Sequence, residues 1–341
     1  MALIHADAKE ALPAELELFS IYPTQTAIEE TRYTQIYPST SLDRGGPLSF
    51  VLAPTEKTYI DGRKVFLYLK TRILSEDTEQ LDLVTSEDDD TLPDGSLVYP
   101  INYFHATAFR TVDVYMNGKN ISTNDTMYPY RAYFETLLSY GKGAKEEALK
   151  AALWYRDKNP VEDVSDAIAK KDVAAVSNNI GAVSRWHRTK GSQVFETFGP
   201  IHSEIFMQDK LIPGFVELTI KLHRADTKFS LMAKTSDRFT ISYDSAILYV
   251  CHKKISDSVR EAHQMTLQKR PMMFPLHKGV MKFFTRGAQR SDLSEANLAS
   301  GILPRRIVFG LVDSLAFSGN NSKCFQFSCK NTSLKLFHHI Y

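Results

Sequence analysis

Short runs in which apolar and polar residues alternate, separated by turn-forming residues, recur along most of the chain. Alternation with a period of two places every second side chain on one face, which is typical of a strand with one buried face. One such run ends at Asn117-Gly118, a dipeptide that favours a tight hairpin turn. The predicted strands cover residues 46–53, 63–74, 103–116, 201–206, 216–222 and 239–254.

A block with helical periodicity interrupts these strands. Residues 130–140 carry apolar side chains three and four positions apart, and Gly141 follows as a predicted C-cap. Residues 144–155 are rich in Ala, Glu and Lys, and residues 161–176 fit a third helix. The pattern therefore predicts a helical insertion at about 129–176 between strands of one sandwich.

The positions of turn-forming residues and the changes in composition along the chain predict four regions. Residues 1–40 are polar and irregular and predict an N-terminal arm, whose tyrosines favour an arm that lies across a neighbour. Residues 41–257 form the first sandwich, and residues 258–274 form a linker with a short helix and Pro271, followed directly by Pro275. Residues 275–341 hold too few strands for a complete sandwich. These last strands are predicted at residues 276–285, 305–312 and 324–337.

Composition narrows the class of protein. The 341 residues are 43% hydrophobic and 24% charged, with a net charge of +1, which is ordinary for a globular protein and gives no support to broad nucleic-acid binding. Three cysteines are too few for a disulfide framework and favour a reducing compartment. The first twenty residues lack a signal-peptide pattern, and no apolar run reaches the ~18 residues that span a bilayer. We therefore expect an intracellular location, in cytoplasm or nucleus, without membrane insertion.

No pattern for catalysis or cofactor binding emerges. Glu87-Asp88-Asp89-Asp90 matches no calcium loop and is interpreted as solvated, although it could bind a hard cation. Cys324 and Cys329, followed by His338-His339, lack the spacing of a zinc site. A nucleophile elbow, a Walker loop and a dinucleotide fingerprint are also missing. The sequence predicts no catalytic, cofactor-binding or metal-binding residues, and a protein that is not an enzyme.

Several longer segments, in one order along the chain, resemble a known family. They resemble the double jelly-roll, hexon-like major capsid proteins of Polinton (Maverick) elements and adintoviruses, whose copies also reside in animal genomes. The resemblance extends from about Tyr22 to about Phe327. The segments that carry it are Tyr22–Glu30 (YPTQTAIEE), Asp113–Gly118 (DVYMNG), Tyr128–Tyr140 (YPYRAYFETLLSY), His202–Lys210 (HSEIFMQDK) and Leu303–Asp313 (LPRRIVFGLVD).

The resemblance implies an all-β double jelly-roll sandwich in which three copies form a pseudo-hexagonal capsomer. It implies a virion location after assembly, with other capsid proteins such as a penton protein as partners, and no sequence-specific nucleic-acid binding. Insertions between strands form towers in this family, so residues 129–176 are a candidate tower or subunit contact. The family pattern continues beyond Phe327, whereas this chain stops at Tyr341, so we expect an incomplete second jelly roll.

Five residues are candidates for the subunit interface: Tyr130, Arg131, Phe134, Arg305 and Arg306. The aromatic start of the helical insertion suits an interface anchor, but the same aromatics suit a cap on the sandwich core. The two arginines precede an apolar run and either pair with a neighbour or flank a strand. On the interface interpretation, Arg131→Glu weakens association and leaves the fold intact.

Two other functions stay open at this point. A monomeric β-sandwich module that recognises protein or carbohydrate predicts a stable monomer with a saturable ligand. A sandwich hydrolase requires carboxylates or histidines gathered at one end, and the sequence does not show them.

Overall fold

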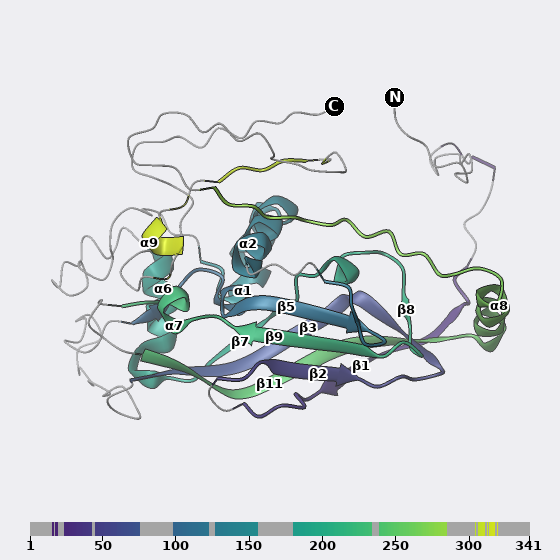
Figure 1. Cartoon of the computed structure of the whole chain (residues 1–341), viewed down its shortest axis with the longest axis horizontal. Helices are drawn as coiled ribbons and strands as arrows, with labels where there is room; N and C mark the ends of the chain where they lie inside the picture. Colours follow the sequence, from purple (N-terminus) through teal and green to yellow (C-terminus); the bar gives the residue numbers. More distant parts are fainter. Residues whose placement is uncertain are drawn as a thin grey trace.

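A computed structural model of the chain describes residues 24–42, 45–75, 98–122, 127–155, 180–233 and 239–284, with isolated residues at 16, 18 and 19 and short pieces between 304 and 319. Within these residues the chain is a sandwich of two antiparallel sheets with short helices around it (Figure 1). The β-sandwich class predicted from the alternation is confirmed.

The first sheet has five strands. Its order is β1 (Ile28–Ile36), β11 (Phe239–Ile255), β3 (Thr58–Ser75) and β7 (Phe195–Pro200), and the short β8 (Ile212–Pro213) also pairs with β3. The two long central strands are paired over almost their whole length, from Phe239 opposite Ser75 to Lys254 opposite Thr58. Side chains from alternate positions of these strands, such as Leu67 and Leu248, fill the space between the sheets.

The second sheet has the order β2 (Leu48–Leu52), β9 (Leu218–Arg224), β5 (Phe109–Met116) and β6 (Lys119–Asn120). Its central β9 alternates buried and half-buried side chains, as the sequence predicts for a strand with one face in the core. Phe50 and Ile220 from this sheet are fully buried in the same hydrophobic core as Leu67. A separate two-stranded ladder joins β4 (Tyr99–Pro100) and β10 (Leu231–Met232).

The strand order is that of a jelly roll. When the short β4, β8 and β10 are set aside, eight strands remain, and the first, eighth, third and sixth form one sheet. The second, seventh, fourth and fifth form the other. Each sheet thus mixes strands from both ends of the chain, which is the two-Greek-key arrangement of jelly rolls.

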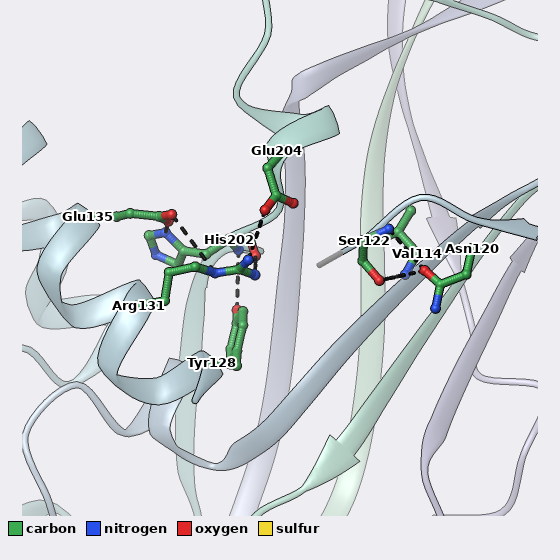
Figure 2. Close-up of polar contacts among 8 residues, drawn as sticks. All are labelled: Val114, Asn120, Ser122, Tyr128, Arg131, Glu135, His202 and Glu204. Atoms are coloured by element: carbon green, nitrogen blue, oxygen red, sulfur yellow. Dashed lines mark hydrogen bonds and ion pairs between the residues drawn. The ribbon is translucent and has the colours of Figure 1, made fainter. Parts of the chain in front are cut away.

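The predicted hairpin at Asn117-Gly118 is confirmed. Both residues have positive φ, 46° and 75°, which is the backbone that a tight two-residue turn between twisted strands requires. The turn pairs Met116 with Lys119. Beyond it, the Ser122 hydroxyl donates to the Asn120 side-chain oxygen at 2.7 Å and accepts from the Val114 N–H at 3.2 Å (Figure 2).

The helices that the structure describes lie mostly in connections. Among the described residues, five helical segments occupy the connection from β6 to β7. Three overlap the predicted insertion, namely α2 (Tyr128–Ser139), α3 (Lys142–Glu146) and η2 (Ala148–Ala152), and α6 (Ile180–Thr189) and η3 (Lys190–Ser192) follow it. The predicted helix at residues 161–176 lies outside the described residues. The others are α1 (Phe104–Thr107), η4 (Glu204–Phe206), α7 (Thr227–Ser230), α8 (Asp257–Leu267) and α9 (Ser314–Phe317).

Some local predictions are wrong. The predicted arm contains β1, an edge strand, and the start of the predicted strand 103–116 is helix α1. Residues 201–206 form no strand but a 3-10 turn, while the strand lies just before them in β7. The predicted helix 144–155 divides at Glu147 into α3 and η2, and ends at Leu153 in a left-handed conformation.

The last predicted strands also differ from the structure. Residues 276–284 and 306–310 form no strand, and they pair with none of the sheets among the described residues. Gly141 is the N-cap of α3, and α2 ends at an extended Tyr140. The predicted strand 324–337 lies outside the described residues.

Candidate subunit interface at helix α2

Helix α2 begins the insertion and packs against β5 and α1 (Figure 1). Pro129 occupies its first turn, where a missing N–H costs no helical hydrogen bond. The buried residues of α2 gather in the first turn and a half, from Tyr128 to Ala132, with Thr136 one turn later. The start of α2 is therefore part of the subunit interior.

Arg131 is the most heavily bonded side chain of this helix. Its guanidinium forms an ion pair with Glu204 (Nη1 to Oε1, 2.9 Å) and donates to the His202 carbonyl oxygen at 3.2 Å (Figure 2). Both side chains are almost wholly buried, at 5% and 8% exposure. The guanidinium also lies 5.8 Å from the centre of the Tyr128 ring. A buried charge needs such partners, because removal from water is costly without them.

His202 extends this network across α2. Its Nδ1 lies 2.9 Å from Glu135 Oε2, and its Nε2 lies 2.6 Å from the Tyr103 hydroxyl. A carboxylate only accepts hydrogen bonds, so Nδ1–H of His202 donates to Glu135 and Nε2 accepts from Tyr103. Burial raises the pKa of Tyr103 far above its ordinary value, which keeps this phenol protonated as a donor.

The network connects α2 to the segment that follows β7. Arg131 and Glu135 come from the helix, whereas His202 and Glu204 come from the chain just after the strand and from η4. The network is thus a crosslink within one subunit that fixes the angle of α2 on the sandwich.

The structure brings together three of the five candidate interface residues, all on α2. Tyr130 is buried against the rings of Phe229 and Phe317, Arg131 is buried as described, and Phe134 is half-buried. Arg306 is exposed, and Arg305 lies outside the described residues. The interface role of these residues stays a prediction, while Tyr130 and Arg131 demonstrably pack within their own subunit.

The burial of Arg131 corrects the expectation that Arg131→Glu leaves the fold intact. A carboxylate in its place would face Glu204 and Glu135 in the interior. We therefore expect Arg131→Glu to disturb the fold, so that variant does not test an interface role alone.

The surface that α2 presents to solvent is apolar at its C-terminal end. Leu137 and Leu138 are 43% and 45% exposed, and with Phe134 they occupy positions three and four apart on one side of the helix. Tyr133, by contrast, turns inward and stacks on Trp154 at 4.8 Å. The sequence shows this apolar stripe but not which part of it the fold leaves exposed.

An extended segment, residues 271–284, crosses the same side of the molecule and is called the strap here (Figure 1). The Lys210 ammonium donates to the Met273 carbonyl oxygen at 2.7 Å, and Phe274 packs against the main core. At Gly279 the strap passes close to α2, since a Cβ there would lie 3.7 Å from Arg131 Cδ. Met281 is half-buried against the smaller hydrophobic cluster around Tyr130 and Trp186. Four other apolar side chains of the strap are exposed: Met273, Leu276, Val280 and Phe283.

The described residues give little support to a catalytic or metal-binding site. There, no three His, Cys, Asp or Glu side chains come together in a way that would hold a metal ion. No helix in that part of the chain is both long enough and apolar enough to cross a membrane.

The comparisons with known proteins give distant similarities, and no family model matches the chain. A Caenorhabditis elegans protein of uncharacterised function is 21% identical over 300 residues, which cover 87% of this chain and 66% of that protein.

Among solved structures, the chain is similar to a chain of the Sputnik virophage, with a TM-score of 0.45, 13% identity and coverage of 74% of this chain and 53% of that one. It is also similar to the Faustovirus major capsid protein, with a TM-score of 0.39, 8% identity and coverage of 73% and 58%. The mavirus major capsid protein has a TM-score of 0.34, 12% identity and coverage of 74% and 52%. The chain thus spans slightly more than half the length of these structures and just under two thirds of the nematode protein.

Proposed function

We propose that this chain is a structural subunit of a capsid-type assembly and not an enzyme. The observation that carries the proposal is the jelly-roll strand order, with an insertion whose first helix, α2, presents Leu137 and Leu138 outward beside the half-buried Phe134. Jelly-roll domains recur in viral capsids. A sandwich whose edge strands are protected is a rigid unit that can pack beside its neighbours.

The exposed apolar surface supports assembly. Leu137, Leu138 and the outward residues of the strap belong to neighbouring segments, and a contiguous apolar surface on a single subunit commonly marks a contact with another protein. The buried network around Arg131 holds α2 rigidly, so this surface is preorganised and association costs little ordering entropy.

The finer proposal follows the ordered segments that resemble Polinton and adintovirus capsid proteins. In it, three copies form a hexon-like capsomer, a penton protein is a further partner, and the assembled protein resides in a virion, either in an active element or in a decayed or host-resident copy. A closed three-fold ring requires two different surfaces per subunit, and α2 with the strap supplies one of them.

The test is the solution mass of the full chain. Light scattering after size exclusion is expected to give about three chain masses, and Leu137→Asp/Leu138→Asp is expected to shift it towards one. Met265→Asp is the matched control, because Met265 is also an exposed apolar residue on a helix, in α8 at one end of the molecule. A stable, folded monomer for the unmodified chain would contradict the proposal.

A monomeric binding module that recognises protein or carbohydrate is the second candidate. The outer face of the first sheet favours it, because the aromatic side chains Phe66, Phe198 and Tyr249 contact one another there.

A further inference from the structure

The outward face of the first sheet is aromatic where an isolated sandwich would be polar. Tyr68 lies opposite Phe198 on β7 and Ile247 on β11, while Phe66 lies opposite Tyr249. The neighbours of these residues in sequence, such as Leu67 and Leu69, are fully buried, so Phe66 and Tyr68 point away from the core.

The rings form a connected surface. Phe66 and Phe198 stack with centroids 5.2 Å apart and an interplanar angle of 28°, and Phe198 contacts Tyr249 edge-on at 5.9 Å. Phe198 remains 40% exposed on β7, the last strand of this sheet. A connected group of exposed aromatic side chains commonly marks a contact with a ligand or a partner, whereas a single one does not.

A hollow of about 570 Å³ opens beside this surface. Tyr68 and Phe198 contribute rings to its wall, and the end of α6 with the chain leading into β7 contributes polar groups. The polar lining that matters here comprises His187, Arg188, Gln193 and Glu196. The hollow is shallow and open to solvent, so a ligand would contact it along one side.

The chemistry of the lining selects among ligands. Glu196 disfavours an anion and Arg188 disfavours a cation, whereas a neutral polyhydroxylated ligand can donate to the first and accept from the second. A purely apolar ligand would hydrogen-bond to none of these exposed groups, whereas a hydroxylated ligand can pair with each of them. The C–H face of a sugar ring packs on aromatic faces, and its hydroxyls project from the edge, where the hollow is polar.

We propose that this hollow binds a saccharide, with Tyr68 and Phe198 as the stacking platform and with Arg188, Gln193, His187 and Glu196 as hydroxyl partners. The site rests on the second candidate function, to which it gives a ligand class and a place. It is separate from the assembly role, since it lies on the first sheet and α6, at the end of the molecule opposite α8 (Figure 1), and shares no residue with α2 or the strap.

The test is saturation-transfer NMR of the full chain with a panel of probes: methyl glycosides of glucose, galactose, mannose and N-acetylglucosamine, and the disaccharides lactose, cellobiose and chitobiose. At least one probe is expected to bind saturably. Phe198→Ala is expected to weaken that binding about tenfold, and Glu196→Gln and Arg188→Gln are expected to weaken it as well.

Phe215→Ala is the matched control, because Phe215 is 39% exposed against 40% for Phe198 and does not line the hollow. Far-UV circular dichroism verifies that each variant is folded. The proposal is overturned if no probe binds the unmodified chain, or if Phe198→Ala binds as well as Phe215→Ala does.

One result would assign the surface to another occupant. If no probe binds and Phe198→Ala lowers the solution mass, the aromatic face is a contact between copies and the saccharide site is refuted. Conversely, a monomeric chain that binds a probe contradicts the capsomer proposal and leaves the saccharide site standing, so the two proposals fail separately.

Discussion

Replacing Arg131 by Met removes the cation at the centre of the buried network while keeping a side chain of similar length. The variant leaves Glu204, which is 8% exposed, facing an apolar group in place of a guanidinium 2.9 Å away. Breaking a buried ion pair by removing one partner costs about 3–5 kcal/mol, because the remaining charge is not compensated. For a chain of 341 residues, whose unfolding entropy is about 0.7 kcal/mol/K, that loss lowers the unfolding midpoint by roughly 4–7 °C.

The assay is thermal and urea unfolding followed by circular dichroism, with Arg72→Met as control. Arg72 pairs with Asp244 at 2.6 Å, a shorter distance than in the buried pair, but its side chain is 33% exposed. Surface pairs contribute only about 0–1 kcal/mol, so the control is expected to lose little stability. The comparison therefore separates burial from distance.

A double variant completes the experiment. Arg131→Met/Glu204→Met removes both charges and is expected to be more stable than Arg131→Met alone, because neither ion then remains buried. If Arg131→Met costs no more than Arg72→Met, the network is not a buried charge cluster and the crosslink between α2 and the segment after β7 is not what fixes the helix.

Two further predictions concern His105, whose ring is 2% exposed. Burial, and to a smaller extent the nearby His202, lowers the pKa of His105 from 6.5 to about 3. Between these two pH values the unfolded chain binds more protons than the folded chain. The contribution of His105 to stability is therefore complete above pH 6.5 and is lost as the pH falls towards 3. Urea unfolding at pH 7 and pH 5 is expected to show a loss of about 2 kcal/mol that His105→Gln reduces, and an unchanged pH dependence in that variant would show that the ring is not buried neutral. Gly199→Ala would place a Cβ 2.8 Å from His105 Cδ2 and is expected to cost about 1–3 kcal/mol. Gly141→Ala, where nothing lies within 4 Å, is the control for the same urea measurement, and equal stability of the two variants would contradict the close contact.

The central strands were predictable because their polarity alternates with their burial. In β9 the buried positions are Leu218, Ile220 and Leu222, and in the hairpin Asn117-Gly118 supplies the required positive φ. The sequence of β7 does not alternate as expected for a strand with one buried face, because Thr197 and Gly199 face the core while Phe198 faces outward. The polarity of β7 is reversed relative to a solvated strand, and this reversal is the signal of the aromatic face.

Other elements have no signal in the sequence itself. β1 is exposed on both faces, so nothing in residues 28–36 imposes alternation. The burial of Arg131 depends on Glu204, which is 73 positions away, and no local pattern announces such a partner. The surface exposed by α2 likewise depends on how Tyr133 packs on Trp154.

The crosslink between α2 and the segment after β7 also bears on how the chain tolerates added sequence. The hydrogen bond from Arg131 to the His202 carbonyl oxygen joins the two ends of the insertion. The chain between them is therefore a closed loop, whatever its length. Each doubling of a closed loop costs only about 0.6 kcal/mol of entropy. A foreign peptide placed at the exposed Gly141, in the turn between α2 and α3, should therefore be carried without loss of the sandwich, which makes this turn a natural position for display.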